Sequence, residues 1–326
     1  MPSRRHLLGG AAALSPGLFP RRSYAQEMLR QVTVVVAFPA GGATDLAARM
    51  VAEALRGRYA AQAVVENRTG AGGRTGTEYT KRLPADGSAL IYTPAFPLVI
   101  SPHVYPNLGY DTLRDFAPVA LTTRSMLALS VGPKVPAAVR TLPDFVAWCR
   151  ANPDAATYGA PSGASQHFAG VLINRATGAN MTLVPYRGGA PSIADLLGGH
   201  IAAVVSPLAE ALPQHRSGEL RILVTLGTRR SRFLADVPSA GEHGFPDIVF
   251  QDWSGVFAPA GTPPALIQRA NAIINDLMRS ERGVEALARF GAEPDPQDPD
   301  AFATAVRADW ERYRDIVRSS GFVGED

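Results

Sequence analysis

The sequence predicts an α/β protein with a largely parallel sheet, and three observations support this prediction. Apolar runs, many of them β-branched, alternate with helical stretches along most of the chain, which is typical of βαβ units. The chain has 326 residues, 46% of them hydrophobic, a length that corresponds to about two domains. Its 31 glycines and 27 prolines separate these elements and form no low-complexity tract.

The first part of the chain is expected to form strands joined by helices. The strands are predicted at 32–38, 63–66 and 89–93, and the helices at 44–59 and 75–82. Thr44 is the expected N-cap of the first helix. The residues Pro-Ala-Asp-Gly at 84–87 have the chemistry of a turn.

The central part continues the alternation, and the last part is mainly helical. Gly178 is expected to end the second central helix as its C-cap. No internal repeat is visible. The predicted strands are 127–131, 156–158, 183–186, 201–205, 222–225 and 255–257, and the predicted helices are 142–151, 165–177, 191–197, 266–278, 283–290 and 300–318.

The N-terminus predicts export from the cytoplasm. Arg4 and Arg5 precede a short apolar stretch at 7–14, and cleavage after Ala25 fits the small residues there. The arginine pair resembles a twin-arginine signal, and an ordinary secretory signal is the alternative. The apolar stretch is too short to span a membrane.

The charge of the chain argues against nucleic-acid binding. The formal net charge is +3, but residues 1–25 hold four of the 32 basic residues and no acidic one. Without them the 29 acidic residues outnumber the basic ones, and no basic-aromatic stripe remains. Cys149 is the single cysteine, so an intrachain disulfide is impossible, and we expect it to be buried in a helix. The scattered histidines predict no metal site.

Two glycine-rich loops, 39–45 and 70–76, each follow a predicted strand and precede a predicted helix. Such loops offer backbone N–H groups and the positive end of a helix dipole to an anion. Neither supplies a nucleophile or a base. The second loop has Thr75 where a dinucleotide fingerprint needs glycine, and it lacks the Lys-Ser or Lys-Thr of a P-loop. The loops therefore predict binding of a small anion rather than its chemical conversion.

Six motifs follow one another from Val32 onward: V-V-A-F-P-A-G-G-A-T-D, E-N-R-T-G-A-G-G-R-T-G, L-P-A-D-G, Y-G-A-P-S-G-A-S-Q-H-F, V-P-Y-R-G-G-A-P-S-I-A-D-L-L-G-G-H and W-S-G-V-F-A-P-A-G-T-P. In this order they resemble the Bug family, the periplasmic solute receptors of tripartite tricarboxylate transporters. The resemblance implies a Venus-flytrap fold with two α/β domains, a ligand in the cleft between them and closure by a hinge motion.

The resemblance also implies boundaries and partners. Residues 1–25 would be the export signal, 26–126 plus 236–326 domain one, and 127–235 domain two. The ligand would be a small carboxylate, with dicarboxylic and aromatic acids among the candidates, for delivery to integral membrane transporter subunits. We expect a monomer with no cofactor and no enzymatic activity.

The ligand-binding residues implied by the resemblance lie in four loops, whose amides and small hydroxyl groups suit a carboxylate. Two glycines in the first loop allow the backbone to approach a ligand closely. The expected set is Phe38, Pro39, Ala40, Gly41, Gly42, Thr44, Asp45, Gly72, Gly73, Arg74, Ser162, Ser165, His167, Tyr186, Arg187 and Gly188.

Three of these residues have a second interpretation. Asp45 can cap its helix rather than contact a carboxylate, although an amino group on the ligand could use it. Arg74 can pair with a second anionic group of the ligand or be a solvated surface residue. Tyr186 can cover the ligand or be an aromatic residue of an edge strand.

The stretch 202–207, Ala-Ala-Val-Val-Ser-Pro, is less polar than the family pattern. We expect it to make the pocket floor apolar, which together with Arg74 favours an aromatic or partly apolar acid over citrate. Trp253 is expected to be a core or hinge residue.

Two other functions stay open at this point. A receptor of the same fold could report its ligand to a sensor kinase instead of a transporter. An exported α/β hydrolase would need an activated nucleophile, but His167 replaces the last glycine of a nucleophile elbow at 163–167. Asp195 and His200 complete no recognisable triad order.

Overall fold

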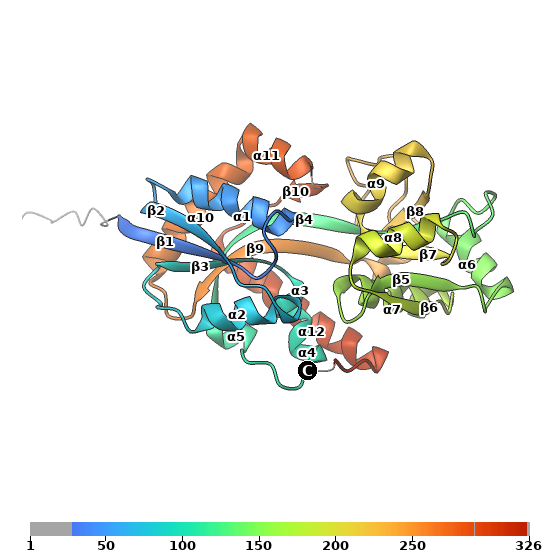
Figure 1. Cartoon of the computed structure of the whole chain (residues 1–326), viewed down its shortest axis with the longest axis horizontal. Coiled ribbons are helices and arrows are strands. Elements are labelled where there is room, and N and C mark those ends of the chain that lie inside the picture. The colour runs from blue at the N-terminus through green and yellow to red at the C-terminus, as the bar shows by residue number, and fades with distance from the viewer. Residues whose placement is uncertain (1–27, 290, 325–326) are drawn as a thin grey trace, which may run out of the picture.

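The computed structural model describes residues 28–289 and 291–324, which form two lobes joined by long strands (Figure 1). Lobe one holds the N-terminal elements together with the C-terminal helices. Its elements are β1 (Leu29–Val36), α1 (Ala43–Leu55), β2 (Ala60–Asn67), η1 (Ala71–Gly73), α2 (Arg74–Lys81), β3 (Ala89–Pro94), α3 (Phe96–Val99), α4 (Ser101–Val104), α5 (Thr112–Asp115), α10 (Pro264–Arg279), α11 (Glu281–Ala288), β10 (Ala292–Pro294) and α12 (Pro299–Ser320).

Lobe two holds the central part of the chain, and two strands, β4 and β9, connect it to lobe one (Figure 1). The elements of lobe two are α6 (Leu142–Ala151), β5 (Thr157–Pro161), α7 (Ser165–Thr177), β6 (Thr182–Tyr186), α8 (Gly189–Leu197), β7 (Ala203–Pro207), α9 (Leu208–Ser217), β8 (Arg221–Thr225) and η2 (Pro246–Ile248). The connecting strands are β4 (Phe116–Val131) and β9 (Gln251–Pro259).

One strand, β4, belongs to the sheets of both lobes. From Phe116 to Met126 it pairs with β9 of lobe one, and from Leu127 to Val131 it pairs with β7 of lobe two. The resulting order is β2-β1-β3-β9-β4-β7-β5-β6, with β8 and β10 also on β4. β1 is parallel to β2 and β3, and β5 is parallel to β6 and β7. The carboxyl ends of each parallel set therefore lie at one edge of its sheet.

Apolar periodicity explains why these segments form layers. α1 buries Ala48, Val51 and Leu55 against the sheet of lobe one, while Arg49 and Glu53 on its other face stay exposed. In β1 both faces are covered, so Val34, Val35 and Val36 are all fully buried, as in other parallel sheets. Each such side chain contributes about 1.5–3 kcal/mol to folding by burial.

Several sequence predictions are confirmed at the level of single elements. The predicted helices 142–151 and 165–177 coincide with α6 and α7, and Gly178 ends α7 in the left-handed conformation. Cys149 is 1% exposed within α6, and burial raises the pKa of its thiol to about 12. Trp253 is 1% exposed and donates from Nε1 to Asp309 at 2.8 Å.

Other predictions were wrong in their boundaries. α1 ends at Leu55 rather than at 59, because the chain turns at Gly57, whose φ is +72°. Gly42, not Thr44, is the N-cap of α1, and Thr44 lies within the first turn. The first part of β4 was not predicted, because Pro118 and Arg124 interrupt its apolar pattern. The helix α9 was not predicted either, because it contains Pro213.

The predicted export signal at 1–25 and the predicted helical residue Phe290 lie outside the described residues. Within the described part of the chain, none of the helices combines the length and the apolar character needed to cross a membrane.

Candidate functional site

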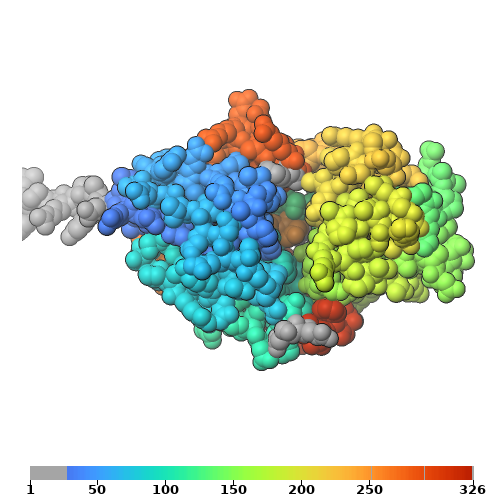
Figure 2. Space-filling view, viewed as in Figure 1, coloured from blue at the N-terminus to red at the C-terminus, as the bar shows by residue number. Residues whose placement is uncertain are grey.

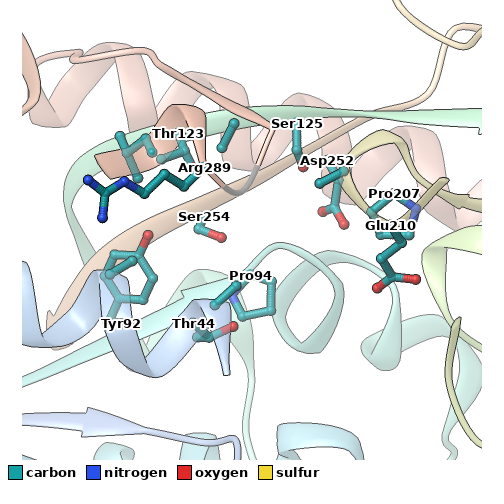
Figure 3. A pocket seen from close by; sticks show the side chains of 15 residues that line it. Thr44, Tyr92, Pro94, Thr123, Ser125, Pro207, Glu210, Asp252, Ser254 and Arg289 are labelled. Carbon is teal, nitrogen blue, oxygen red and sulfur yellow. The ribbon is translucent and has the colours of Figure 1, made fainter. Parts of the chain in front are cut away.

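A cavity of about 380 Å³ lies where the two lobes face each other. Figure 2 shows the cleft between the lobes, and Figure 3 shows the cavity from close by. Both lobes and both connecting strands supply its wall. The residues that line it are Ala43, Thr44, Ala47, Tyr92, Pro94, Thr123, Ser125, Pro207, Ala209, Glu210, Asp252, Ser254, Leu287, Arg289 and Ala292.

The N-termini of α1 and α9 line this cavity, because it lies at the carboxyl ends of the parallel strands. α1 follows β1, and α7, α8 and α9 follow β5, β6 and β7. None of these four helices has a side-chain hydrogen bond at its N-cap, which is Gly42, Ala164, Gly188 or Pro207. First-turn amides have no acceptor within their own helix. The edge of the cleft therefore offers N–H groups and positive helix ends to an anion.

The loop between β1 and α1 is held in shape by Asp45. Its carboxylate is 1% exposed and accepts hydrogen bonds from the Gly41 amide, from Asn67 and, at 2.8 Å, from Arg49 Nε. The Arg49 guanidinium lowers the pKa of Asp45 to about 2, with further help from the two amides. Asp45 thus fixes the left-handed turn at Gly41, and its contact with a ligand stays a prediction.

The tip of the loop between β1 and α1, which Asp45 holds in shape, is exposed toward the cleft. Residues 39–43 are exposed, and Thr44 is half-buried and lines the cavity. Phe38 is half-buried, with its ring 6.4 Å from that of Phe96. Among the residues predicted to bind ligand, Thr44 is the one that lines this cavity.

The second glycine loop packs beneath the first one. A Cβ on Gly73 would lie 2.9 Å from the Phe38 ring, so only glycine allows the two loops to pack this closely. Gly72 likewise has its backbone against the ring of Phe96. The loop itself borders a different surface hollow, lined by Ala71, Arg74, Thr75, Glu78 and residues 107–110.

Arg74 lies in that second hollow and not at the cavity between the lobes. Its guanidinium carbon is 3.5 Å from the ring centroid of Tyr105, and its Nε donates to the Ala71 carbonyl at 3.0 Å. Stacking on Tyr105 keeps the charge on the outer side of lobe one. This position favours the second interpretation of Arg74, that of a surface residue, over its pairing with a ligand.

The loop before α7 reaches the cavity wall through Ser165. The Ser165 side chain is 3% exposed and hydrogen-bonds to Asp252. His167 is 7% exposed, and its Nδ1 accepts from the Gly163 amide while its ring contacts Phe168 and Phe322. Burial lowers the pKa of His167, so this histidine is a neutral brace for the loop. Ser162 is exposed at the loop surface.

The loop after β6 is built around Tyr186. Its hydroxyl donates to Asp195 at 2.7 Å, and Asp195 also contacts His200 Nδ1 at 3.3 Å. These bonds direct Tyr186 toward α8, the helix that carries Asp195. Arg187 is exposed, and Gly188 is the N-cap of α8.

The stretch that was expected to form the pocket floor contributes little to the cavity. Residues 203–206 are buried in the core of lobe two, because β7 is covered on both faces, and of that stretch only Pro207 lines the cavity. The wall combines apolar side chains such as Ala47 and Leu287 with the hydroxyls of Thr44, Tyr92 and Ser254 and three charged side chains.

Three charged residues were missed by sequence reasoning: Glu210, Asp252 and Arg289. They lie on α9, on β9 and just after α11, and only the fold brings these elements together (Figure 3). Asp252 carried a usable signal, because a lone acid stands between the apolar residues 248–250 and 253. Glu210 and Arg289 resemble ordinary polar residues of surface helices.

Asp252 has an unusual environment for a carboxylate. Burial raises its pKa to about 6, and the nearby Asp309 adds to the shift, while the Trp253 amide and Ser165 oppose it. Burial also raises the pKa of Glu210. Among the described residues neither acid forms an ion pair, and Arg289 forms none.

The chain matches the family described as the tripartite tricarboxylate transporter family receptor over residues 47–322. It belongs to this receptor family. Protein BugT of Bordetella pertussis is 34% identical over 315 residues, which are 96% of this chain and 94% of BugT. The resemblance to the Bug family is therefore confirmed.

Solved structures agree with this membership. The R. palustris protein Rpa4515, solved with adipate, has a TM-score of 0.78 and 32% identity, over 90% of this chain and 98% of its own. The periplasmic binding protein BugD has a TM-score of 0.75 and 27% identity, over 91% of this chain and 99% of its own. The receptor thus has the predicted two-lobed α/β fold of periplasmic binding proteins, and its family is one of solute receptors, not of enzymes.

Proposed function

We propose that this receptor binds a small carboxylate in the cleft and delivers it to the integral membrane subunits of a tripartite tricarboxylate transporter. The observation that carries the proposal is the N-terminus of α1, which has no side-chain cap and lines the cavity with its first-turn residues Ala43 and Thr44. Amides and positive helix ends retain an anion without reacting with it. The cavity volume of about 380 Å³ is at the small end of the range for ligand sites.

The family and its relatives support the same function. The family is named for tricarboxylate transport, and Rpa4515 was solved with adipate. Small carboxylic acids are accordingly the candidate ligands, and dicarboxylic and aromatic acids are among those to be tested. We propose that the receptor acts as a monomer without a cofactor.

We further propose that the two lobes are hinged domains. The first boundary lies near 126/127, and the second lies after η2 rather than at the expected 235/236, because η2 packs against α7 of lobe two. The change of β4 partners between Met126 and Leu127 supports the first boundary. Closure of the cleft would bring the loop at 39–44 toward the loops at 162–165 and 186–188. In this way residues that do not line the open cavity would contact the ligand.

We propose that the chain reaches the periplasm through its N-terminal signal, by the twin-arginine route. The pairs Arg4-Arg5 and Arg21-Arg22 support this route. Export of a reporter fused to residues 1–25 should then stop when Arg4 and Arg5 are changed to lysine. Export that persists would favour the general secretory route.

A thermal-shift screen of residues 26–326 tests the binding proposal. The panel contains amino acids, dicarboxylates, tricarboxylates and aromatic acids. A ligand that binds only the folded chain raises the melting temperature with its saturation, by about 2.7 kcal/mol of stability at 100 times Kd. Recovery of the ligand chemically unchanged would exclude a hydrolase.

A second measurement separates delivery from sensing. Cells that lack the receptor should lose uptake of the ligand found in the screen. Normal uptake together with lost induction of ligand-responsive genes would favour a sensor-kinase partner. A folded, ligand-free chain that no carboxylate stabilises would contradict the proposed function.

A further inference from the structure

We propose that Glu210 and Asp252 select, among small carboxylates, those that also carry a protonated amine, and disfavour those with a second carboxylate. This inference rests on the proposed function, since it concerns the same cavity. The α1 N-terminus is proposed to bind one carboxylate of the ligand. The inference concerns the chemical group at the opposite end of the ligand.

The charges in the cavity are separated along its length. Figure 3 shows Arg289 and Tyr92 at one end and Asp252 and Glu210 at the other, with the Ser254 hydroxyl between them. Thr44, in the first turn of α1, also faces this space. A ligand carboxylate is matched by the Arg289 guanidinium and the α1 amides, because all of these groups are donors.

The opposite end has acceptors in place of donors. In the described residues Glu210 and Asp252 have no cationic partner. Asp252 is half-buried, and Glu210 is an exposed residue of the cavity wall whose carboxylate lies against the start of α8. A carboxylate in this condition gains most from a ligand cation that donates hydrogen bonds to it. A second ligand carboxylate would instead meet two like charges.

Glu210 also blocks the helix end that could otherwise hold a second carboxylate. An added Cβ on Gly189 would lie 1.7 Å from Glu210 Oε2, so the carboxylate rests against the backbone at the start of α8. The α8 N-terminus therefore already faces an anion supplied by the protein. A dicarboxylate cannot use both α1 and α8.

Isothermal titration of the exported chain at pH 7.5 tests the inference with acids of matched length. For chains of four, five and six carbons, the probes are the ω-amino acid, the dicarboxylate and the monocarboxylate. At the best length the amino acid should bind at least about tenfold more tightly than the other two, as expected for a charge-assisted hydrogen bond. Glu210→Gln and Asp252→Asn should each reduce this preference by about fivefold or more.

Glu285→Gln is the matched control, because it removes the same charge from an exposed helix position that does not line the cavity. Thermal unfolding without ligand checks that each variant is folded. A dicarboxylate that binds as tightly as the amino acid at every length, or a preference unchanged in both variants, would overturn the inference and leave carboxylate binding intact. Absence of binding by every probe would overturn the proposed function as well.

Discussion

The helices that start on the cleft side of the sheets all lack a side-chain cap, whereas four of the helices that start elsewhere have one. α1, α7, α8 and α9 have no side-chain cap, and neither do α2, α3, α4 and α10, whereas α5, α6, α11 and α12 are capped by Asp111, Thr141, Ser280 and Asp298. The caps of the outer helices satisfy first-turn amides, which helps folding by about 1 kcal/mol each. The cleft helices forgo this stabilisation, and the first-turn amides of α1 stay available to a ligand.

The carboxylates show the same contrast. Asp45, outside the cavity, has its charge satisfied by Arg49 and two amides, and its pKa is lowered to about 2. Asp252 and Glu210, which line the cavity, form no ion pair within the described residues, and their pKa values are raised. The charge of Asp45 is thus matched within the chain, while the charges of Asp252 and Glu210 are left for a partner from outside.

Capping α1 should have the largest effect. Gly42 has φ −76° and ψ 167°, and a Cβ there would meet only the Pro39 carbonyl, at 3.6 Å, so an aspartate fits. Gly42→Asp should occupy the first-turn amides and repel the ligand carboxylate, and binding measured by calorimetry should weaken about 100-fold. Stability should rise by about 0.5 kcal/mol.

Two controls sharpen this prediction. Gly42→Asn caps without charge and should weaken binding less, and Gly42→Ala adds a Cβ alone and should weaken it least. Equal affinity in all three variants would show that the α1 N-terminus does not hold the ligand.

Asp252→Asn should change how stability depends on pH. The fold raises the Asp252 pKa from 3.8 to about 6, so the protonated acid is favoured in the folded state. Its stabilisation is complete below pH 3.8 and is lost as the pH rises through 6. At pH 7.5 the variant should therefore be more stable than the wild type by on the order of 2 kcal/mol.

Urea unfolding between pH 4 and pH 8 measures this effect, and the two proteins should have equal stability near pH 4. A variant that is less stable than the wild type at pH 7.5 would contradict the account of Asp252 as an unmatched charge.

Removal of an outer cap should have a smaller effect, confined to stability. Asp298 accepts from the Ala301 amide at 2.8 Å at the start of α12. Asp298→Ala should cost about 1 kcal/mol in chemical unfolding, with ligand affinity unchanged within twofold. Loss of affinity in Asp298→Ala would show that the cap of α12 also influences ligand binding in the cleft, and would contradict this prediction.

Arg74→Ala should have the smallest effect. The stacking of Arg74 on Tyr105 at a partly exposed site is worth about 0.5–1 kcal/mol. Unfolding should register that loss, and calorimetry should detect no change in ligand affinity. A drop of tenfold or more in affinity would place Arg74 in the closed binding site after all.

The sequence predicted most of the scaffold and little of the cavity wall. Helices such as α6 and α7 were predicted to the residue because their caps and apolar spacing are local signals. The 16 residues of β4 were only partly recognised, since their strand character depends on pairing with β9. Glu210, Asp252 and Arg289 were missed because a cavity joins side chains from distant elements, and no local pattern marks such neighbours.

The strand shared by both lobes has a mechanical consequence. Flexible linkers between two lobes allow large rotations. In this receptor β4 passes directly from its pairing with β9, which ends at Met126, to its pairing with β7, which begins at Leu127. Any rotation of the lobes must twist this strand together with β9, and the ladders on both sides resist the twist. If the lobes rotate as proposed, the twist of these two strands would limit the angle of closure and favour a return to the starting arrangement.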